Sequence, residues 1–157
     1  MNEQPILAVE DLQTYFFTNT GVVKAVDGVS FELRKGETLG IVGESGSGKS
    51  MTAWSILRLV PEPAGRIVGG KILYQGEDLL EKSQAEMQEI RGSGICMVMQ
   101  DPLTSLNPVF NIGNQIIECL RMDSTPSGQS LSERAIELLA EVHIPAPRSR
   151  IAAFPHQ

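Results

Sequence analysis

The feature that most restricts this chain is the run Gly-Glu-Ser-Gly-Ser-Gly-Lys-Ser at residues 43–50. It matches the pattern G-x-x-x-x-G-K-[ST] in full. Glycines at this spacing let the backbone curl so that successive N–H groups point at phosphate oxygens, with no Cβ in the way. An apolar run at 38–42 precedes the loop and a helical pattern follows it, as a phosphate-binding loop requires. The sequence therefore predicts a binding site for ATP or GTP.

Individual loop residues have distinct expected roles. Lys49 is expected to reach the β- and γ-phosphates, and the Ser50 hydroxyl is expected to ligate Mg²⁺. The positive end of the following helix dipole lies at the same place. A dinucleotide-binding loop is excluded, because its pattern needs glycine where Met51 stands. The residues expected to bind the nucleotide are Gly43, Glu44, Ser45, Gly46, Ser47, Gly48, Lys49, Ser50 and Met51.

The remaining pattern is α/β, with a β-rich lobe over 1–100 and a helical lobe over 101–157. Strands are predicted at 6–9, 15–17, 22–26, 29–33 and 71–74, and fully apolar parallel strands at 38–42 and 95–99. Helices are predicted at 50–60, 81–90, 112–120 and 130–142, the last opened by a capping-box signature and ended by Pro145 and Pro147. A Ser/Thr/Pro/Gly-rich linker at 123–129 separates the last two helices.

Charge and composition exclude several classes of protein. The net charge of −6 argues against sequence-independent binding to nucleic acid or to an anionic membrane surface. No apolar stretch is long enough for a membrane span, and the N-terminus lacks a signal peptide pattern, so we expect a cytoplasmic protein. Cys96 and Cys119 stand in apolar surroundings and are predicted to be buried thiols in a reducing compartment.

Several motifs outside the loop carry a family resemblance. They are residues 12–16, 25–31 and 35–38 before the loop, 70–79 and 97–102 after it, then 102–108 and 154–157. With these motifs the chain resembles ATP-binding cassette (ABC) ATPases along essentially its whole length. The last two motifs, together with the loop 43–50, are similar to the oligopeptide, dipeptide and nickel importer branch. The resemblance implies an α/β P-loop NTPase cassette with an antiparallel β-subdomain, a partial helical subdomain and an incomplete core sheet.

The resemblance also assigns roles to residues outside the loop. It implies that Phe16 stacks on adenine, with Tyr15 as the alternative, whereas plain β-core packing is the competing explanation for either ring. Gln100 resembles the Q-loop glutamine, which approaches Mg²⁺ and the attacking water and senses the membrane subunit. Lys49 and Gln100 are therefore the expected catalytic residues, and Ser50 and Gln100 the expected metal contacts.

The family's partners and activity follow from the same resemblance. It implies an ATPase coupled to transport, peripheral on the inner face of the cell membrane. The expected partners are transmembrane permease subunits, reached through the Q-loop and helical region, and a second ABC ATPase, identical or not. A substrate-binding protein is an indirect partner, and nucleic acid is not one. The transported ligand, a peptide or nickel, stays open.

Other family motifs do not occur in this sequence, among them the signature motif, the Walker B Asp, the catalytic Glu and the switch His. His143 and His156 are expected to be surface or capping residues and do not replace the switch His. We therefore expect the chain as given to bind ATP without turnover, and a non-hydrolysing half-cassette or degenerate subunit is the alternative function. A small-molecule kinase is disfavoured, because its phosphate-binding arginines would be clustered, whereas Arg121, Arg134, Arg148 and Arg150 are scattered.

Overall fold

The computed structural model describes residues 4–100, 105–122 and 130–157. The chain forms two compact units, one up to Met97 and one from Val98 onward. Among the helices described, none is long and apolar enough to cross a membrane. The expected linker at 123–129 lies outside the described residues.

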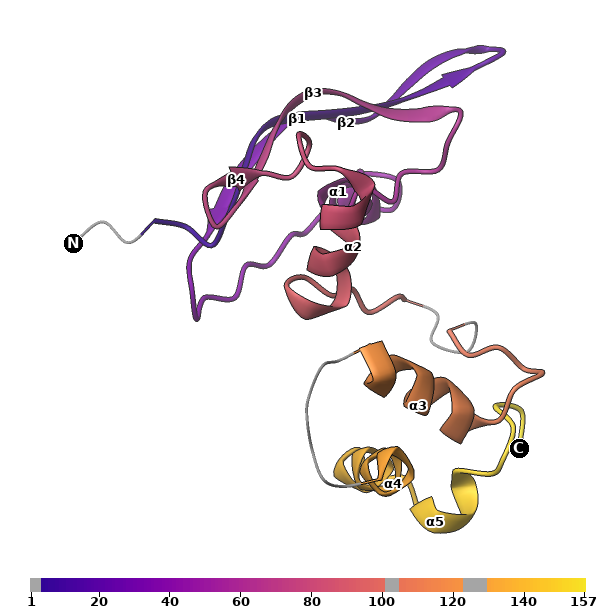
Figure 1. Cartoon of the computed structure of the whole chain (residues 1–157). Coiled ribbons are helices and arrows are strands. Elements are labelled where there is room, and N and C mark those ends of the chain that lie inside the picture. The colour runs from indigo at the N-terminus through magenta and orange to yellow at the C-terminus, as the bar shows by residue number, and fades with distance from the viewer. Residues whose placement is uncertain (1–3, 101–104, 123–129) are drawn as a thin grey trace. The chain divides into compact units, whose positions relative to one another are not determined.

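The first unit is built on a four-stranded antiparallel sheet with the order β2-β1-β3-β4 (Figure 1). β1 is central and pairs with β2 on one side and β3 on the other, so most of the sheet depends on it. The bounds are β1 Leu7–Thr18, β2 Gly21–Leu33, β3 Gly65–Tyr74 and β4 Glu77–Asp78.

Four of the predicted short strands merge into the two long strands β1 and β2. Their register shifts between Val9 and Leu12, where Asp11 has a φ of 46°. Gly28, with a φ of 79°, is unpaired at the next register shift, between Leu12 and Gln13, and a Cβ built on it would lie 3.2 Å from Asp11 Oδ1. Such bulges let a strand continue through residues that break the alternating pattern, so the sequence alone suggested separate strands.

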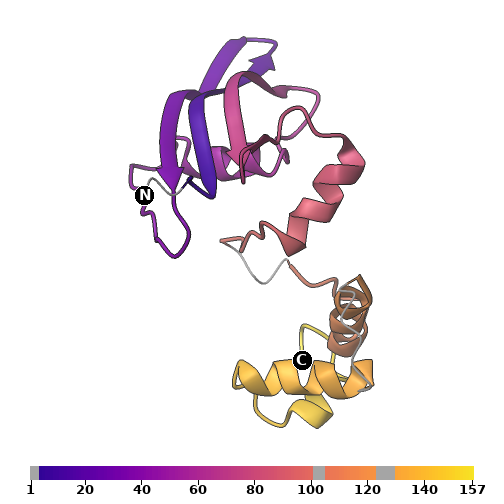
Figure 2. The ribbon, with the colours of Figure 1, turned by 60° about the vertical axis from the view of Figure 1, so that its left-hand side comes forward.

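Two helices complete the first unit, α1 Lys49–Ile56 and α2 Gln84–Ser93 (Figure 2). The helix predicted to reach residue 60 ends earlier, because Leu57 caps it and Arg58 has a φ of 51°. α2 begins three residues later than predicted, since Ser83 and Glu86 form a full capping box at its start. The buried apolar core joins sheet and helices through Val9, Leu12, Val26, Ile72, Leu79 and Met87.

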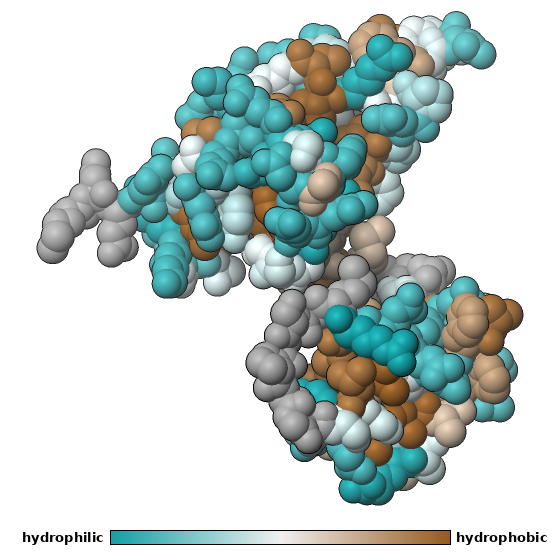
Figure 3. Space-filling view, viewed as in Figure 1, coloured by the Kyte–Doolittle hydropathy of each residue, from teal (hydrophilic) through white to brown (hydrophobic). Residues whose placement is uncertain are grey.

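The prediction of parallel strands at 38–42 and 95–99 is wrong for this structure. No described strand includes either run, and Val42 and Val98 are 92% and 91% exposed. A parallel strand needs a neighbour for its N–H and C=O groups, and neither run is paired with any described strand. Apolar side chains therefore remain at the surface of both units (Figure 3).

The prediction of two buried thiols is also wrong, because Cys96 and Cys119 are both exposed. Cys96 belongs to the run 95–99, which is part of no described strand, although Ile95 forms an isolated bridge with Arg91. Cys119 lies on an exposed side of its helix. An apolar sequence neighbourhood did not translate into burial at either position.

The second unit is helical, with α3 Ile112–Met122, α4 Leu131–Glu141 and α5 Pro147–Arg150. The Ser130 side chain accepts a hydrogen bond from Glu133 N, so the predicted start of α4 is confirmed. Pro147 begins α5, a short helix that the sequence did not suggest. Gly113 packs tightly at the start of α3, where a Cβ would lie 2.4 Å from Ile151 Cγ1.

Candidate functional site

The glycine-rich run 43–48 forms a loop that leads directly into α1. Gly48 is the N-cap of α1, with a φ of 90°. A Cβ built on Gly48 would lie 2.2 Å from the carbonyl oxygen of Ala25, so backbone conformation and space both require glycine there. The loop is therefore held against β2 at the point where the helix begins.

The start of α1 offers free donors to an anion. Gly48 has no side chain with which to cap the helix, and the first turn contains no acidic residue. The first N–H groups of a helix have no intrahelical acceptor and lie at the positive end of its dipole. Ser50, which is exposed, belongs to this first turn. This arrangement suits a phosphate group.

Lys49 lies folded over the loop. Its Nζ donates to the carbonyl oxygens of Gly43 and Glu44, both at 2.7 Å, and to Ser47 Oγ at 3.3 Å. Phosphate oxygens could replace these acceptors, since all are oxygen atoms within reach of the same ammonium group. Met51 points elsewhere, because its half-buried side chain packs against the apolar core.

The two aromatic candidates for adenine stacking have different environments. Phe16 is half-buried, and a Cβ on Gly65 would lie 2.8 Å from its ring atom Cε1. The Tyr15 hydroxyl donates to Asp27 Oδ1 at 2.5 Å, and Lys24 Nζ lies 5.2 Å from the Tyr15 ring centroid. Phe16 thus contacts β3, and Tyr15 takes part in a polar surface cluster. The stacking role of Phe16 stays a prediction.

Titration in this polar cluster follows from its hydrogen bonds. The hydrogen bond from Tyr15 holds the pKa of Asp27 below its ordinary value, with a further contribution from Lys24. The same bond to Asp27 raises the pKa of the Tyr15 phenol. The Asp27 carboxylate also raises the pKa of Lys24. At neutral pH the cluster therefore holds a carboxylate, an ammonium group and a neutral phenol.

Gln100 is exposed and belongs to the second unit, whereas the loop belongs to the first. Its approach to the phosphate site accordingly stays a prediction. The motif residues that follow it, 101–104, lie outside the described part of the chain. His143, which has a φ of 60°, and His156 are exposed.

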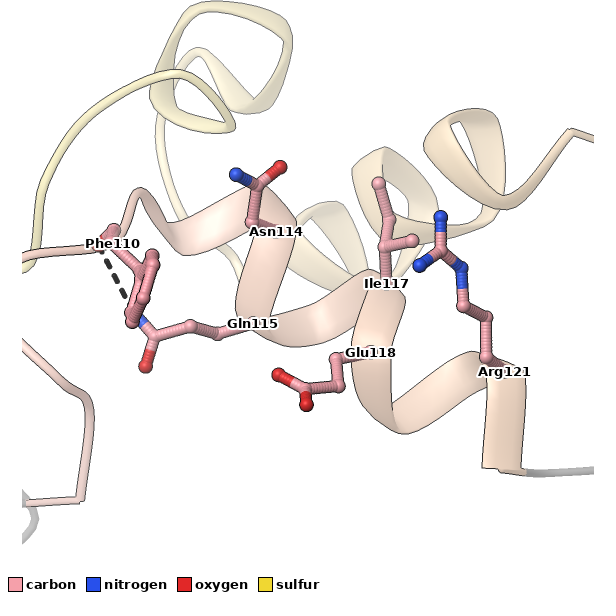
Figure 4. Close-up of a pocket in the computed structure, with 6 residues that line it drawn as sticks. All are labelled: Phe110, Asn114, Gln115, Ile117, Glu118 and Arg121. Atoms are coloured by element: carbon pink, nitrogen blue, oxygen red, sulfur yellow. Dashed lines mark hydrogen bonds between the residues drawn. The ribbon is translucent and has the colours of Figure 1, made fainter.

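The second unit has a cavity of about 380 Å³ along α3. Gln115 Nε2 donates to the Phe110 carbonyl at 3.0 Å and so ties α3 to the segment before it. Figure 4 shows both apolar and charged side chains around the cavity. The lining residues are Phe110, Asn114, Gln115, Ile117, Glu118 and Arg121.

Sequence reasoning missed a buried polar contact at the far end of the helix that follows the loop. Thr14 Oγ1 and Ser55 Oγ lie 2.7 Å apart and join β1 to α1. Both residues are fully buried. No local pattern indicated this pair, because its members stand 41 positions apart.

The family of the chain follows from comparison with known sequences. The sequence profile of the ABC transporter family matches residues 26–156, which include the complete phosphate loop. The chain belongs to the ABC transporter family. Among curated relatives, the oligopeptide transport ATP-binding protein OppD of Bacillus subtilis is 49% identical over 152 residues, which are 97% of this chain and 42% of OppD. The dipeptide transport ATP-binding protein DppD of the same organism is 43% identical over 154 residues, 98% of this chain and 46% of DppD.

Solved structures show the same fold. A post-hydrolysis dimer of the ATP-binding cassette MJ0796 bound to ADP and Pi matches with a TM-score of 0.76 at 20% identity. That match covers 96% of this chain and 62% of the MJ0796 chain. The ABC cassette fold expected from the sequence is thus confirmed, whereas this ABC transporter chain spans less than half the length of OppD and DppD.

Proposed function

We propose that this chain is the nucleotide-binding part of an ATP-hydrolysing subunit of a peptide importer. The observation that supports this most directly is the complete loop 43–50 at the uncapped start of α1, with Lys49 Nζ over the loop carbonyls. In this proposal the loop amides and Lys49 bind the β- and γ-phosphates of ATP. The names of the relatives, which include oligopeptide and dipeptide transport, favour a peptide over nickel.

Mg²⁺ would enter with the nucleotide. Within the described ranges, no three His, Cys, Asp or Glu side chains gather to hold a metal. A metal bound mainly by phosphates and water needs few protein ligands, and the exposed Ser50 hydroxyl beside Lys49 suits that requirement. When bound, Mg²⁺ would neutralise charge on the β- and γ-phosphates. Gln100 is the proposed second metal contact and would orient the attacking water.

The partners belong to the same proposal. A permease subunit would contact the helical lobe 101–157, where the exposed side chains of Val109, at 71%, and Phe110, at 53%, offer an apolar surface next to the cavity along α3. A second ABC ATPase would complete the ATP site, and a substrate-binding protein would act through the permease. The proposed location is the cytoplasmic face of the cell membrane.

The second candidate function is a nucleotide-binding module without hydrolysis. It is favoured for residues 1–157 by themselves, because neither the catalytic Glu nor the signature motif occurs among them. Hydrolysis needs a positioned water and stabilisation of the charge that develops on the transferred phosphate. The loop would provide part of the charge stabilisation and would not position the water. The proposed roles of Lys49, Ser50 and the loop amides are identical in both functions.

The test measures ATP·Mg²⁺ binding and phosphate release by the purified chain and two variants. Lys49→Ala removes the ammonium group over the loop, whereas Lys71→Ala removes an exposed lysine on β3 and serves as the matched control. We expect binding by the wild type and by Lys71→Ala, a loss of at least tenfold in affinity for Lys49→Ala, equivalent to about 1.4 kcal/mol, and no phosphate release by any of them. A folded wild-type chain that binds no ATP would refute the proposal. Phosphate release by the wild-type chain that is abolished in Lys49→Ala would exclude the non-hydrolysing alternative.

A further inference from the structure

The buried contact between Thr14 and Ser55 joins the central strand to the helix that follows the phosphate loop. Their hydroxyl oxygens lie 2.7 Å apart, and both residues have no exposed surface. A buried hydroxyl pair between two elements restricts how those elements can shift, because each new position must preserve the hydrogen bond.

The direction of this hydrogen bond follows from the neighbouring contact. Ser55 Oγ donates to the Met51 carbonyl at 2.7 Å. A serine hydroxyl has only one proton, so Thr14 must be the donor to Ser55. A continuous chain of hydrogen bonds thus leads from β1 through Ser55 to Met51, the residue directly after Ser50.

A second contact holds the other end of α1. Gly48 lies against the Ala25 carbonyl, and the next residue of β2, Val26, is paired with Thr14. Gly48 and Ser55 are seven positions apart, about 10 Å along a helix. One end of α1 therefore lies against β2 and the other is bonded to β1, at neighbouring positions of the two paired strands.

We propose that Thr14 and Ser55 are positioning residues that set the distance between the phosphate loop and the aromatic side chains of β1. Tyr15 and Phe16 follow Thr14 directly, so a movement of α1 relative to Thr14 changes the spacing between loop and rings. This inference rests on the proposed function and on the predicted stacking of Phe16, or of Tyr15, on adenine, so that one nucleotide would contact the loop with its phosphates and β1 with its base. A ligand that has phosphates and no base would be insensitive to that spacing.

The experiment compares the affinities of the full chain for ATP·Mg²⁺ and for tripolyphosphate·Mg²⁺. Thr14→Val and Ser55→Ala remove the hydrogen bond, and Thr14→Ser keeps the hydroxyl. Thr18→Val is the matched control, because the Thr18 hydroxyl bonds to the Gly21 carbonyl within the β1–β2 turn. We expect both disrupting variants to weaken ATP binding about fivefold, the effect of one ordinary hydrogen bond, while tripolyphosphate binding stays within twofold of the wild type. Thr14→Ser and Thr18→Val should keep the wild-type ratio of the two affinities.

Equal loss of both affinities in Thr14→Val, or no loss of either, would overturn the positioning role and leave ATP binding as proposed. A wild-type chain that binds neither ligand would overturn the proposed function together with this inference. If thermal melting shows that Thr14→Val is unfolded at the assay temperature, Ser55→Ala and Thr14→Ser decide the question. The inference is supported if the affinity for ATP relative to that for tripolyphosphate is lowered in Ser55→Ala and unchanged in Thr14→Ser, and any other combination rejects it.

Discussion

Replacing Gly48 by alanine tests the contact between the phosphate loop and β2. Gly48, Gly46 and Gly36 have φ values of 90°, 83° and 80°, so alanine is strained by a similar amount at all three positions. A Cβ would meet nothing within 4 Å at Gly36 and Gly46, whereas at Gly48 it would lie 2.2 Å from the Ala25 carbonyl oxygen. Positive φ costs a non-glycine residue about 1–2 kcal/mol. Forcing an extra carbon into a packed site adds about 1–3 kcal/mol.

We therefore expect Gly36→Ala and Gly46→Ala to lower the free energy of unfolding by about 1–2 kcal/mol, and Gly48→Ala by about 2–5 kcal/mol. Urea unfolding followed by the fluorescence of Trp54 measures this, because Trp54 is the chain's single tryptophan and belongs to α1. The linear extrapolation gives the three free energies under identical conditions. Equal losses for Gly48→Ala and Gly36→Ala would refute the argument, since the contact with Ala25 would then not restrict the loop.

Three further changes test other parts of the first unit. Asp27→Asn should reduce the loss of stability on acidification. The pKa of Asp27 is lowered in the folded state, so its contribution to stability is present above about pH 4 and is lost as the pH falls through the folded pKa. Melting curves between about pH 2.5 and about pH 6 will measure this loss in the wild type and in the variant. Ser83→Ala should lower the free energy of unfolding by about 0.5–2 kcal/mol, because it removes the capping box of α2; an unchanged urea midpoint would contradict this. Val42→Asp should change that free energy by less than about 0.5 kcal/mol while it reduces self-association in light scattering, because Val42 is 92% exposed.

The glycine-rich loop and the start of α4 could be predicted from sequence because they depend on local signals. The loop pattern is complete within residues 43–50, and Ser130 caps α4 as its sequence suggests. Strand pairing is not local. The apolar runs 38–42 and 95–99 have the composition of buried strands, but a strand forms only when another is present to pair with it.

The parts of the candidate site that the sequence did not predict all depend on distant contacts. Thr14 and Ser55 meet across 41 positions, and Gly48 is restricted by Ala25 on another element. The register shifts that merge the predicted short strands likewise involve residues of two different strands, Asp11 of β1 and Gly28 of β2. The exposed thiols have the same explanation, since burial is decided by what packs over a residue and not by its neighbours in sequence.

In the proposed function, the hydrogen bonds of Lys49 would make phosphate binding an exchange of partners. Its ammonium group has the Gly43 and Glu44 carbonyls as acceptors at 2.7 Å, so the proposed phosphate would have to displace them. The free energy gained on phosphate binding would be the difference between a charge-assisted hydrogen bond to phosphate and a hydrogen bond to a neutral carbonyl. This difference is smaller than the full strength of either bond. When the phosphate leaves, the same carbonyls can take the ammonium group back without rebuilding the loop. The backbone carbonyls of the loop would thus solvate the ammonium group between one proposed ligand and the next, which would lower the barrier to release as well as the net affinity.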